Sequence, residues 1–217
     1  MRIAHLGHSC LLIAIADQRI LIDPGGFSPG IVDVTGISVI LVTHQHADHV
    51  DLQRLPAILE CNPQATMYAE PQAAAVMEEA GIAAELAVSG STLTFGQAQV
   101  TPVGEQHALI NEALPRVGNL GFVLRSEGEP SIFHPGDAYD AEPGPVDILA
   151  LPLNAAWAAS RDTVVFVRRI SPRVSIPIHD ALLSDIGRRL YLSHVQSFGP
   201  DGMEIRDLSD GVPFEVR

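Results

Sequence analysis

The stretch Val39-Ile40-Leu41-Val42-Thr43-His44-Gln45-His46-Ala47-Asp48-His49 decides how this chain is organised. Its uninterrupted β-branched and leucine run is typical of a strand buried on both faces, and it ends in a cluster of histidines and an aspartate. In an extended segment, residues two apart project to the same side, so His44 and His46 can bind one cation together. Asp48 and His49, one turn further on, are aimed elsewhere.

This polar cluster has two interpretations. Imidazoles and a carboxylate that are brought together out of water must be paired or coordinated, and a metal ion does that. The alternative is a polar loop whose histidines are merely solvated, which is an ordinary outcome for a lone His-x-His pair. The pattern His-x-His-x-Asp-His directly after a hydrophobic strand favours the metal site.

The segment Thr43 to His49 resembles the signature of the metallo-β-lactamase fold superfamily of metal-dependent hydrolases. The opening Leu6-Gly7-His8-Ser9-Cys10 is similar to that of the ascorbate 6-phosphate lactonase-like branch of this superfamily. With Asp23-Pro24 and Ile176-Pro177-Ile178-His179, the resemblance covers nearly the whole chain. It implies an α/β fold in four layers, an αββα sandwich.

The order of hydrophobic segments and turns agrees with two packed sheets flanked by helices. Strands are expected over residues 2–6, 10–16, 19–22, 37–42, 65–69, 92–95, 98–103, 120–125, 131–134, 146–151 and 174–178, with edge strands over 203–206 and 213–216. Helices are expected over residues 56–60, 71–80, 163–170 and 184–196. The first three strands predict an antiparallel meander.

Composition limits the size and the partners of the protein. The 217 residues, 47% of them hydrophobic, predict one domain over residues 1–217 with a sizeable core. A net charge of −13 leaves no basic surface for tracking a nucleic-acid backbone, so no nucleic-acid partner is expected. All 13 cationic residues are arginine, which excludes Schiff-base lysines and P-loops.

The two cysteines, Cys10 and Cys61, form no Cys-x-x-Cys pair and are interpreted as free thiols in a reducing compartment. No apolar run approaches the length of a membrane span, so no membrane partner is expected. Ala14-Ile15-Ala16 imitates a signal-peptidase site, but the preceding segment carries only Arg2 as a basic residue. A cytoplasmic protein is therefore predicted.

The superfamily resemblance supplies further ligands at the ends of later strands. His107 matches the next metal-binding histidine of the superfamily, Asp137 its Gly-Asp motif, and His179 its last ligand. The resulting proposal places His44, His46 and His107 on one ion, Asp48, His49 and His179 on the other, and Asp137 between the two ions.

Four other polar residues have more than one interpretation. Asp23 either orients a ligand histidine or forms a simple Asp-Pro turn. His8 either lines the pocket or caps the strand turn. His134 is expected beside the site or in the core, because strand alternation turns it away from the loop tip, and His194 is expected to be a packed or exposed helix residue.

Five histidines and two carboxylates without a thiolate suit two divalent ions, Zn²⁺ in the first place, with Mn²⁺ or Fe²⁺ as alternatives. Superfamily members that run redox chemistry at di-iron carry glutamate where this chain has His46, so hydrolysis is favoured. Two such ions lower the pKa of a shared water toward roughly 7 and make hydroxide available as the nucleophile. Asp48 is the expected catalytic residue, which orients the water or accepts its proton.

The sequence therefore predicts a binuclear metal-dependent hydrolase of a small-molecule ester, lactone or phosphodiester. Residues 151–157 replace a turn that is commonly glycine-rich in relatives, and a shared fold does not carry a shared substrate. The alternative is a metal-bearing sensor or binding protein for a phosphorylated metabolite. The sequence alone does not indicate the oligomeric state.

Overall fold

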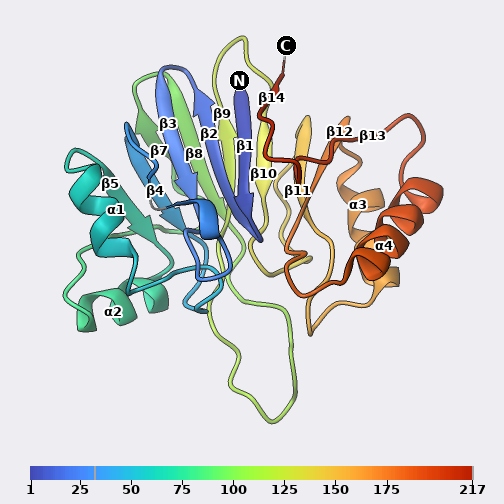
Figure 1. Ribbon diagram of the computed structural model, residues 1–217, viewed down its shortest axis with the longest axis horizontal. Helices are drawn as coiled ribbons and strands as arrows, with labels where there is room; N and C mark the ends of the chain where they lie inside the picture. Colours follow the sequence, from blue (N-terminus) through green and yellow to red (C-terminus); the bar gives the residue numbers. More distant parts are fainter. Residues whose placement is uncertain (32, 217) are drawn as a thin grey trace.

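The architecture is that of a computed structural model, which describes residues 1–31 and 33–216. Two seven-stranded sheets pack face to face at the centre of the molecule, and helices cover the outer face of each sheet (Figure 1). The predicted αββα sandwich is thereby confirmed. The assignment of residues 1–217 to one domain stays a prediction.

The first sheet has the strand order β14-β1-β2-β3-β4-β5-β6. Its strands are β1 (Arg2–Gly7), β2 (Cys10–Ile15), β3 (Gln18–Ile22), β4 (Val39–Val42), β5 (Thr66–Ala69), β6 (Glu85–Leu86) and β14 (Phe214–Glu215). Strands β1 to β3 form the predicted antiparallel meander, and β3 to β6 run parallel to one another.

The second sheet has the strand order β13-β12-β11-β10-β9-β8-β7. Its strands are β7 (Leu93–Phe95), β8 (Ala98–Val103), β9 (Gly121–Arg125), β10 (Ile132–His134), β11 (Ile148–Pro152), β12 (Val174–Ile178) and β13 (Glu204–Ile205). Strands β10 to β13 are parallel, whereas β7, β8, β9 and β10 pair antiparallel in succession. Each sheet therefore has an antiparallel part and a parallel part.

Helices close the two outer faces. A short 3-10 turn, η1 (Pro29–Ile31), precedes the α-helices α1 (Leu55–Cys61), α2 (Pro71–Glu79), α3 (Ser160–Ile170) and α4 (Asp185–Phe198). The first two α-helices lie beside β4 and β5, and the last two lie at the opposite end of the view (Figure 1). No helix among the described residues has the length and hydrophobicity needed to cross a bilayer. Both cysteines are free.

Strand β4 shows why its sequence is an unbroken hydrophobic run. Val39 and Leu41 point into the core between the two sheets, while Ile40 and Val42 pack against Leu55 and other residues of α1 and α2. Successive side chains alternate between faces, so a strand in an inner layer needs apolar residues at every position. A third cluster fills the space between the second sheet and helices α3 and α4.

The structure differs from the sequence expectations mainly at element ends. Strands β8 and β12 have the predicted bounds, but α3 begins at Ser160 rather than at residue 163. The Asp162 carboxylate accepts the backbone N–H of Ala159, which allows the helix to start one turn earlier. Strand β6 was not predicted, because its two residues are exposed and carry no hydrophobic alternation.

Asn62 ties the end of α1 to the loop that enters β4. Its buried side chain accepts the Ile37 N–H at 2.9 Å and donates to the carbonyl oxygens of Val34 and Ile58, each at 2.8 Å. One amide thus pairs three backbone groups, and its bonds to Ile37 and Ile58 are buried. The amide fixes where β4 begins, and β4 carries the residues that follow it.

Replacing Asn62 with alanine is expected to lower the free energy of unfolding by about 2–4 kcal/mol, because buried backbone groups lose their partners. Urea denaturation measures this loss. Gln64→Ala is the matched control, since Gln64 is exposed and its amide donates only to the Ile37 carbonyl; its effect should stay below about 1 kcal/mol. Equal losses in the two variants would contradict the bridging role of Asn62.

Candidate metal centre

The predicted ligands come from separate loops that meet at one end of the two sheets. His44, His46, Asp48 and His49 follow β4, His107 follows β8, Asp137 follows β10, and His179 follows β12. The first loop belongs to one sheet and the other three to the facing sheet. All seven side chains predicted from the sequence lie in groups whose donor atoms are within 4.8 Å of one another.

The first group consists of His44, His46 and His107. His44 Nε2 lies 3.1 Å from His46 Nδ1, and the His107 ring centroid is 4.9 Å and 4.7 Å from the centroids of those two rings. One donor atom of each histidine lies within 4.8 Å of the others, so the three imidazoles could hold one metal ion that takes nitrogen ligands. The structure therefore brings together the three histidines expected on one ion.

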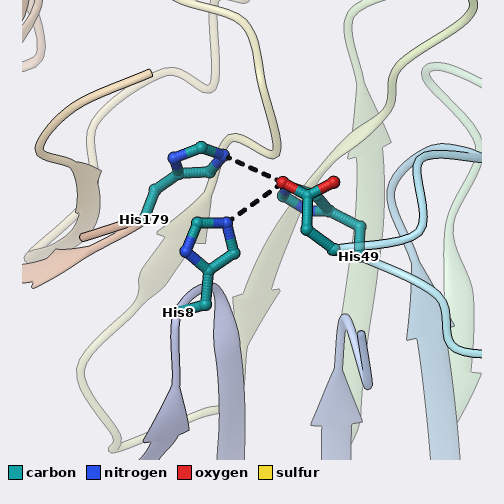
Figure 2. A group of neighbouring side chains, drawn as sticks. His8, His49 and His179 are labelled. Atoms are coloured by element: carbon teal, nitrogen blue, oxygen red, sulfur yellow. Dashed lines mark hydrogen bonds and ion pairs between the residues drawn. The ribbon is translucent and has the colours of Figure 1, made fainter. Parts of the chain in front are cut away.

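The second group consists of Asp48, His49 and His179, joined by His8. Asp48 Oδ2 lies 3.2 Å from His8 Nε2, 3.7 Å from His179 Nε2 and 3.8 Å from His49 Nε2. Figure 2 shows the rings of His8 and His179 directed toward the same carboxylate oxygen. The three residues expected on the other ion are thus close together, with an additional imidazole beside them.

Asp137 lies between the two groups. Its Oδ1 atom is 3.1 Å from His49 Nε2, and its Oδ2 atom is 3.1 Å from His179 Nε2 and 3.4 Å from His107 Nε2. The carboxylate is therefore in contact with histidines of both groups. This is the position that a bridging ligand requires.

Hydrogen bonds set the orientation of the histidine rings. In four of them, Nδ1–H faces an oxygen acceptor. His44 donates to the Thr43 hydroxyl at 3.0 Å, and His49 donates to Asp23 Oδ2 at 2.7 Å. His107 and His179 donate to the carbonyl oxygens of Ala108 and Asn154, each at 2.6 Å. Each bond selects the tautomer that leaves the Nε2 lone pair free. These Nε2 atoms all face the centre.

Asp23 orients His49 and does not serve only as a turn residue. Its fully buried carboxylate accepts the N–H and Oγ–H of Thr43, both at 2.8 Å, as well as the Nδ1–H of His49. The same carboxylate thereby fixes Thr43, just before the His-x-His-x-Asp-His loop, and His49, the last residue of that loop. Its backbone has a φ of 51°, a left-handed conformation that a non-glycine residue adopts only when surrounding contacts demand it.

The buried atoms of the centre fit a divalent cation. Among the described residues, Nε2 of His49, His107 and His179 and Oδ1 of Asp137 are buried and have no hydrogen-bond partner. Buried polar atoms left in this way are costly, whereas nitrogen and carboxylate oxygen are ligands that zinc and related metals take. The donor set therefore matches the chemistry of a metal centre.

Electrostatics prepares several of these groups for coordination. Burial, with the neighbouring His49, lowers the pKa of His44 well below its usual value. Burial opposes ionisation of Asp48, but the His8 hydrogen bond and the charge of His49 lower its pKa to about 2. Burial lowers the pKa of His49, but Asp137 and Asp23 outweigh burial and raise the pKa of that imidazole well above its usual value. The two carboxylates thus favour positive charge at this ring.

Two of the other histidines lie where the sequence indicated. His134 is buried outside the metal-binding groups, donates to the Ser9 carbonyl at 2.8 Å and accepts the Gly136 N–H at 3.2 Å. His194 lies on α4 and bonds Ser160 Oγ at 2.7 Å, away from the centre. His8, whose two interpretations were left open, lines the second group and also occupies the turn between β1 and β2.

Sequence reasoning missed Trp157, the one tryptophan of the chain. Its indole Nε1–H donates to Asp137 Oδ2 at 3.0 Å, and its ring packs edge-on against Tyr139 with centroids 4.7 Å apart. The only available signal was its position just after the strand end at residues 148–152, in the segment that departs from the glycine-rich turn of relatives. An indole there fills the wall of the site and binds its central carboxylate.

Comparison with known proteins gives a consistent picture. A family model described as a beta-lactamase superfamily domain matches residues 2–179, which include all seven predicted ligands. Protein Rv0786c of Mycobacterium tuberculosis is 36% identical over 215 residues, which cover 99% of this chain and 100% of that protein.

Two further proteins extend this likeness. A UPF0173 metal-dependent hydrolase of Alkaliphilus metalliredigens is 29% identical over 195 residues, which cover 82% of this chain and 85% of that protein. The crystal structure of the metallo-beta-lactamase fold protein YhfI from Bacillus subtilis has a TM-score of 0.74 at 12% identity, over 98% of each chain. At that identity the structural likeness shows the fold alone.

Replacing Asp23 with asparagine is expected to weaken metal affinity by about 10- to 100-fold, because the amide cannot hold His49 and Thr43 as the carboxylate does. Competition with a chromophoric chelator measures the affinity. Asp17→Asn is the control, since Asp17 is exposed in the turn after β2, also at positive φ. Unchanged affinity in the Asp23 variant, together with native stability, would show that this carboxylate serves the turn alone.

Proposed function

The chain belongs to the beta-lactamase superfamily, and we propose that it hydrolyses a small ester, lactone or phosphodiester at a centre of two divalent ions. It is a metal-dependent hydrolase with the metallo-β-lactamase fold. The bond that it cleaves, the number of ions and the mechanism are the proposal.

One observation carries the binuclear proposal: Asp137 contacts histidines of both groups. His44, His46 and His107 would hold one ion, Asp48, His49 and His179 the other, and Asp137 would bridge them. Three protein ligands and a shared carboxylate leave coordination positions open, as in hydrolytic metal sites. Because the ligands are imidazole and carboxylate without thiolate, Zn²⁺ is the proposed metal, with Mn²⁺ or Fe²⁺ as alternatives.

Divalent ions in such a site lower the pKa of a coordinated water and polarise the substrate oxygen on which charge develops. The chain's own residues position the reactants. Asp48 is the proposed catalytic residue, because its side chain is 23% exposed whereas Asp137 is buried. Asp48 would orient the water by a hydrogen bond or accept its proton.

The proposed substrate class follows from the opening of the chain and from the wall of the site. The Gly7-His8-Ser9 opening supports placement in the ascorbate 6-phosphate lactonase-like branch, and we propose this placement without its substrate. Trp157 and Asn154 shape the wall beside Asp137 and His179, in the segment where this chain departs from the branch. A small molecule remains the proposed partner, and cytoplasmic residence without nucleic-acid or membrane partners stays a prediction.

The alternative, a metal-bearing sensor of a phosphorylated metabolite, has less support. A sensor has no need of open coordination positions, whereas this donor set would leave positions for water and includes a partly exposed carboxylate. Rapid turnover of a generic phosphodiester or lactone by the metal-loaded protein distinguishes the two functions.

The variants His44→Ala and Asp137→Ala are each expected to lose at least one bound ion and to lose turnover by at least about 10³-fold, because a ligand is removed from one or both groups. Metal content by elemental analysis and hydrolysis of p-nitrophenyl esters, bis-p-nitrophenyl phosphate and simple lactones provide the measurements. His194→Ala, which removes a histidine far from the centre, is the control. Full metal content and full turnover in Asp137→Ala would eliminate the bridging proposal.

Removing metal with a chelator is expected to abolish hydrolysis, and adding about two equivalents of Zn²⁺ or Mn²⁺ should restore it. The restored rate is measured as a function of added metal. Turnover that persists in protein shown to be metal-free would refute the proposed mechanism, whichever substrate is used.

A further inference from the structure

His8 belongs to the second group of side chains, yet none of the proposed ligand roles uses it. Its side chain is fully buried in the turn between β1 and β2, and its ring centroid lies 4.0 Å from that of His179. Figure 2 shows its imidazole pointing at the carboxylate oxygen that also faces His179. A buried imidazole in such a place acts either on the ion or on a ligand.

The hydrogen bond at the other ring nitrogen distinguishes these two actions. The backbone N–H of Ala181 donates to His8 Nδ1 at 3.4 Å, so Nδ1 is the acceptor and Nε2 carries the hydrogen of the neutral ring. In His44, His49, His107 and His179 the arrangement is reversed, because their Nδ1–H groups face oxygen acceptors. The His8 Nε2–H therefore donates to Asp48 Oδ2 at 3.2 Å.

Asp48 has particular need of such a donor. It is the more exposed of the two carboxylates in the centre, and its three short contacts with histidine nitrogens all fall on Oδ2. A partly exposed aspartate has rotamer freedom that would carry Oδ2 away from the centre. A fixed N–H on that oxygen selects the rotamer in which it can bind an ion.

We propose that His8 is a positioning residue that holds Asp48 Oδ2 toward His49 and His179 and so raises the affinity of the second ion. This inference rests on the proposed binuclear centre and assigns no ion contact to His8 itself. The Nε2–H group stabilises a ligand orientation, as hydrogen bonds to metal ligands generally do.

The backbone around His8 makes its side chain a rigid donor. The His8 carbonyl accepts the backbone N–H of His179 at 2.8 Å and the Nε2–H of His5 at 2.7 Å. The Phe27 ring packs edge-on against the imidazole, with centroids 5.2 Å apart. The donor and the His179 ligand thus share one hydrogen-bonded unit, in which the φ of His8 is 50°. Strain of this kind persists where surrounding contacts impose it.

Two substitutions separate positioning from the other possible roles. His8→Gln places an amide N–H at about the reach of imidazole Nε2, so it can still donate to Asp48. His8→Asn suits the left-handed backbone better, but its amide is one carbon shorter and falls short of the carboxylate. Asparagine therefore preserves the turn and loses the bond, whereas glutamine preserves the bond.

The experiment titrates metal-free wild type, His8→Gln and His8→Asn with Zn²⁺ in a calorimeter, and repeats the titration with Co²⁺ while recording visible absorption. His8→Asn is expected to bind the second equivalent about 10- to 100-fold more weakly, with the first equivalent unchanged. His8→Gln should stay within about threefold of wild type for both equivalents. Thermal unfolding of all three proteins confirms that each is folded.

Each other pattern overturns the proposal. Equal weakening in both variants, with altered Co²⁺ absorption, would identify His8 as a ligand. Wild-type affinity in His8→Asn would leave His8 only a turn role. Binding of a single equivalent by wild type would remove the second ion altogether. Because every readout is binding, a protein that gives the expected pattern without hydrolysing any test substrate would refute the proposed reaction and leave the role of His8 intact.

Discussion

The structure depends on the contact between the Asp137 carboxylate and two histidine nitrogens, which requires positive charge between them. Nitrogens of His49 and His179 face the two oxygens of Asp137 at 3.1 Å, and all three side chains are buried. Lone pairs brought together in this way repel unless a cation or a proton lies between them. The hydrogen bonds behind the histidine rings commit Nδ1 and turn Nε2 inward. Positive charge, from a proton or a metal ion, is therefore needed where these buried side chains meet.

The same centre joins the two halves of the sandwich. Its His-x-His-x-Asp-His loop follows a strand of the first sheet, while His107, Asp137 and His179 follow strands of the second. Apolar side chains from both sheets fill the space between them, and the polar ligands close that space at one end. An ion held by residues of both sheets would stabilise their packing, because it would bind only when the sheets are assembled.

Much of this was predictable from sequence. Each predicted ligand follows a strand, and the strand ends before His44, Asp137 and His179 are readable because β4, β10 and β12 are buried along their whole length. The sequence could not indicate how each side chain is oriented or which ring nitrogen carries the hydrogen. The same His8 can occupy a turn and line a pocket, and only the Ala181 N–H, which donates to Nδ1, shows that the ring nitrogen facing Asp48 carries the hydrogen. Trp157 was missed because an indole after a strand carries no metal-binding pattern, although it donates to Asp137.

The indole of Trp157 makes the centre accessible to fluorescence spectroscopy. The chain has one tryptophan, and its N–H is bonded to the carboxylate at the middle of the centre. The ultraviolet fluorescence of this protein therefore originates in large part from a single indole ring that is bonded to Asp137. Because this ring is bonded to Asp137, its fluorescence is expected to change when an ion binds there, which would allow metal loading to be followed without a label.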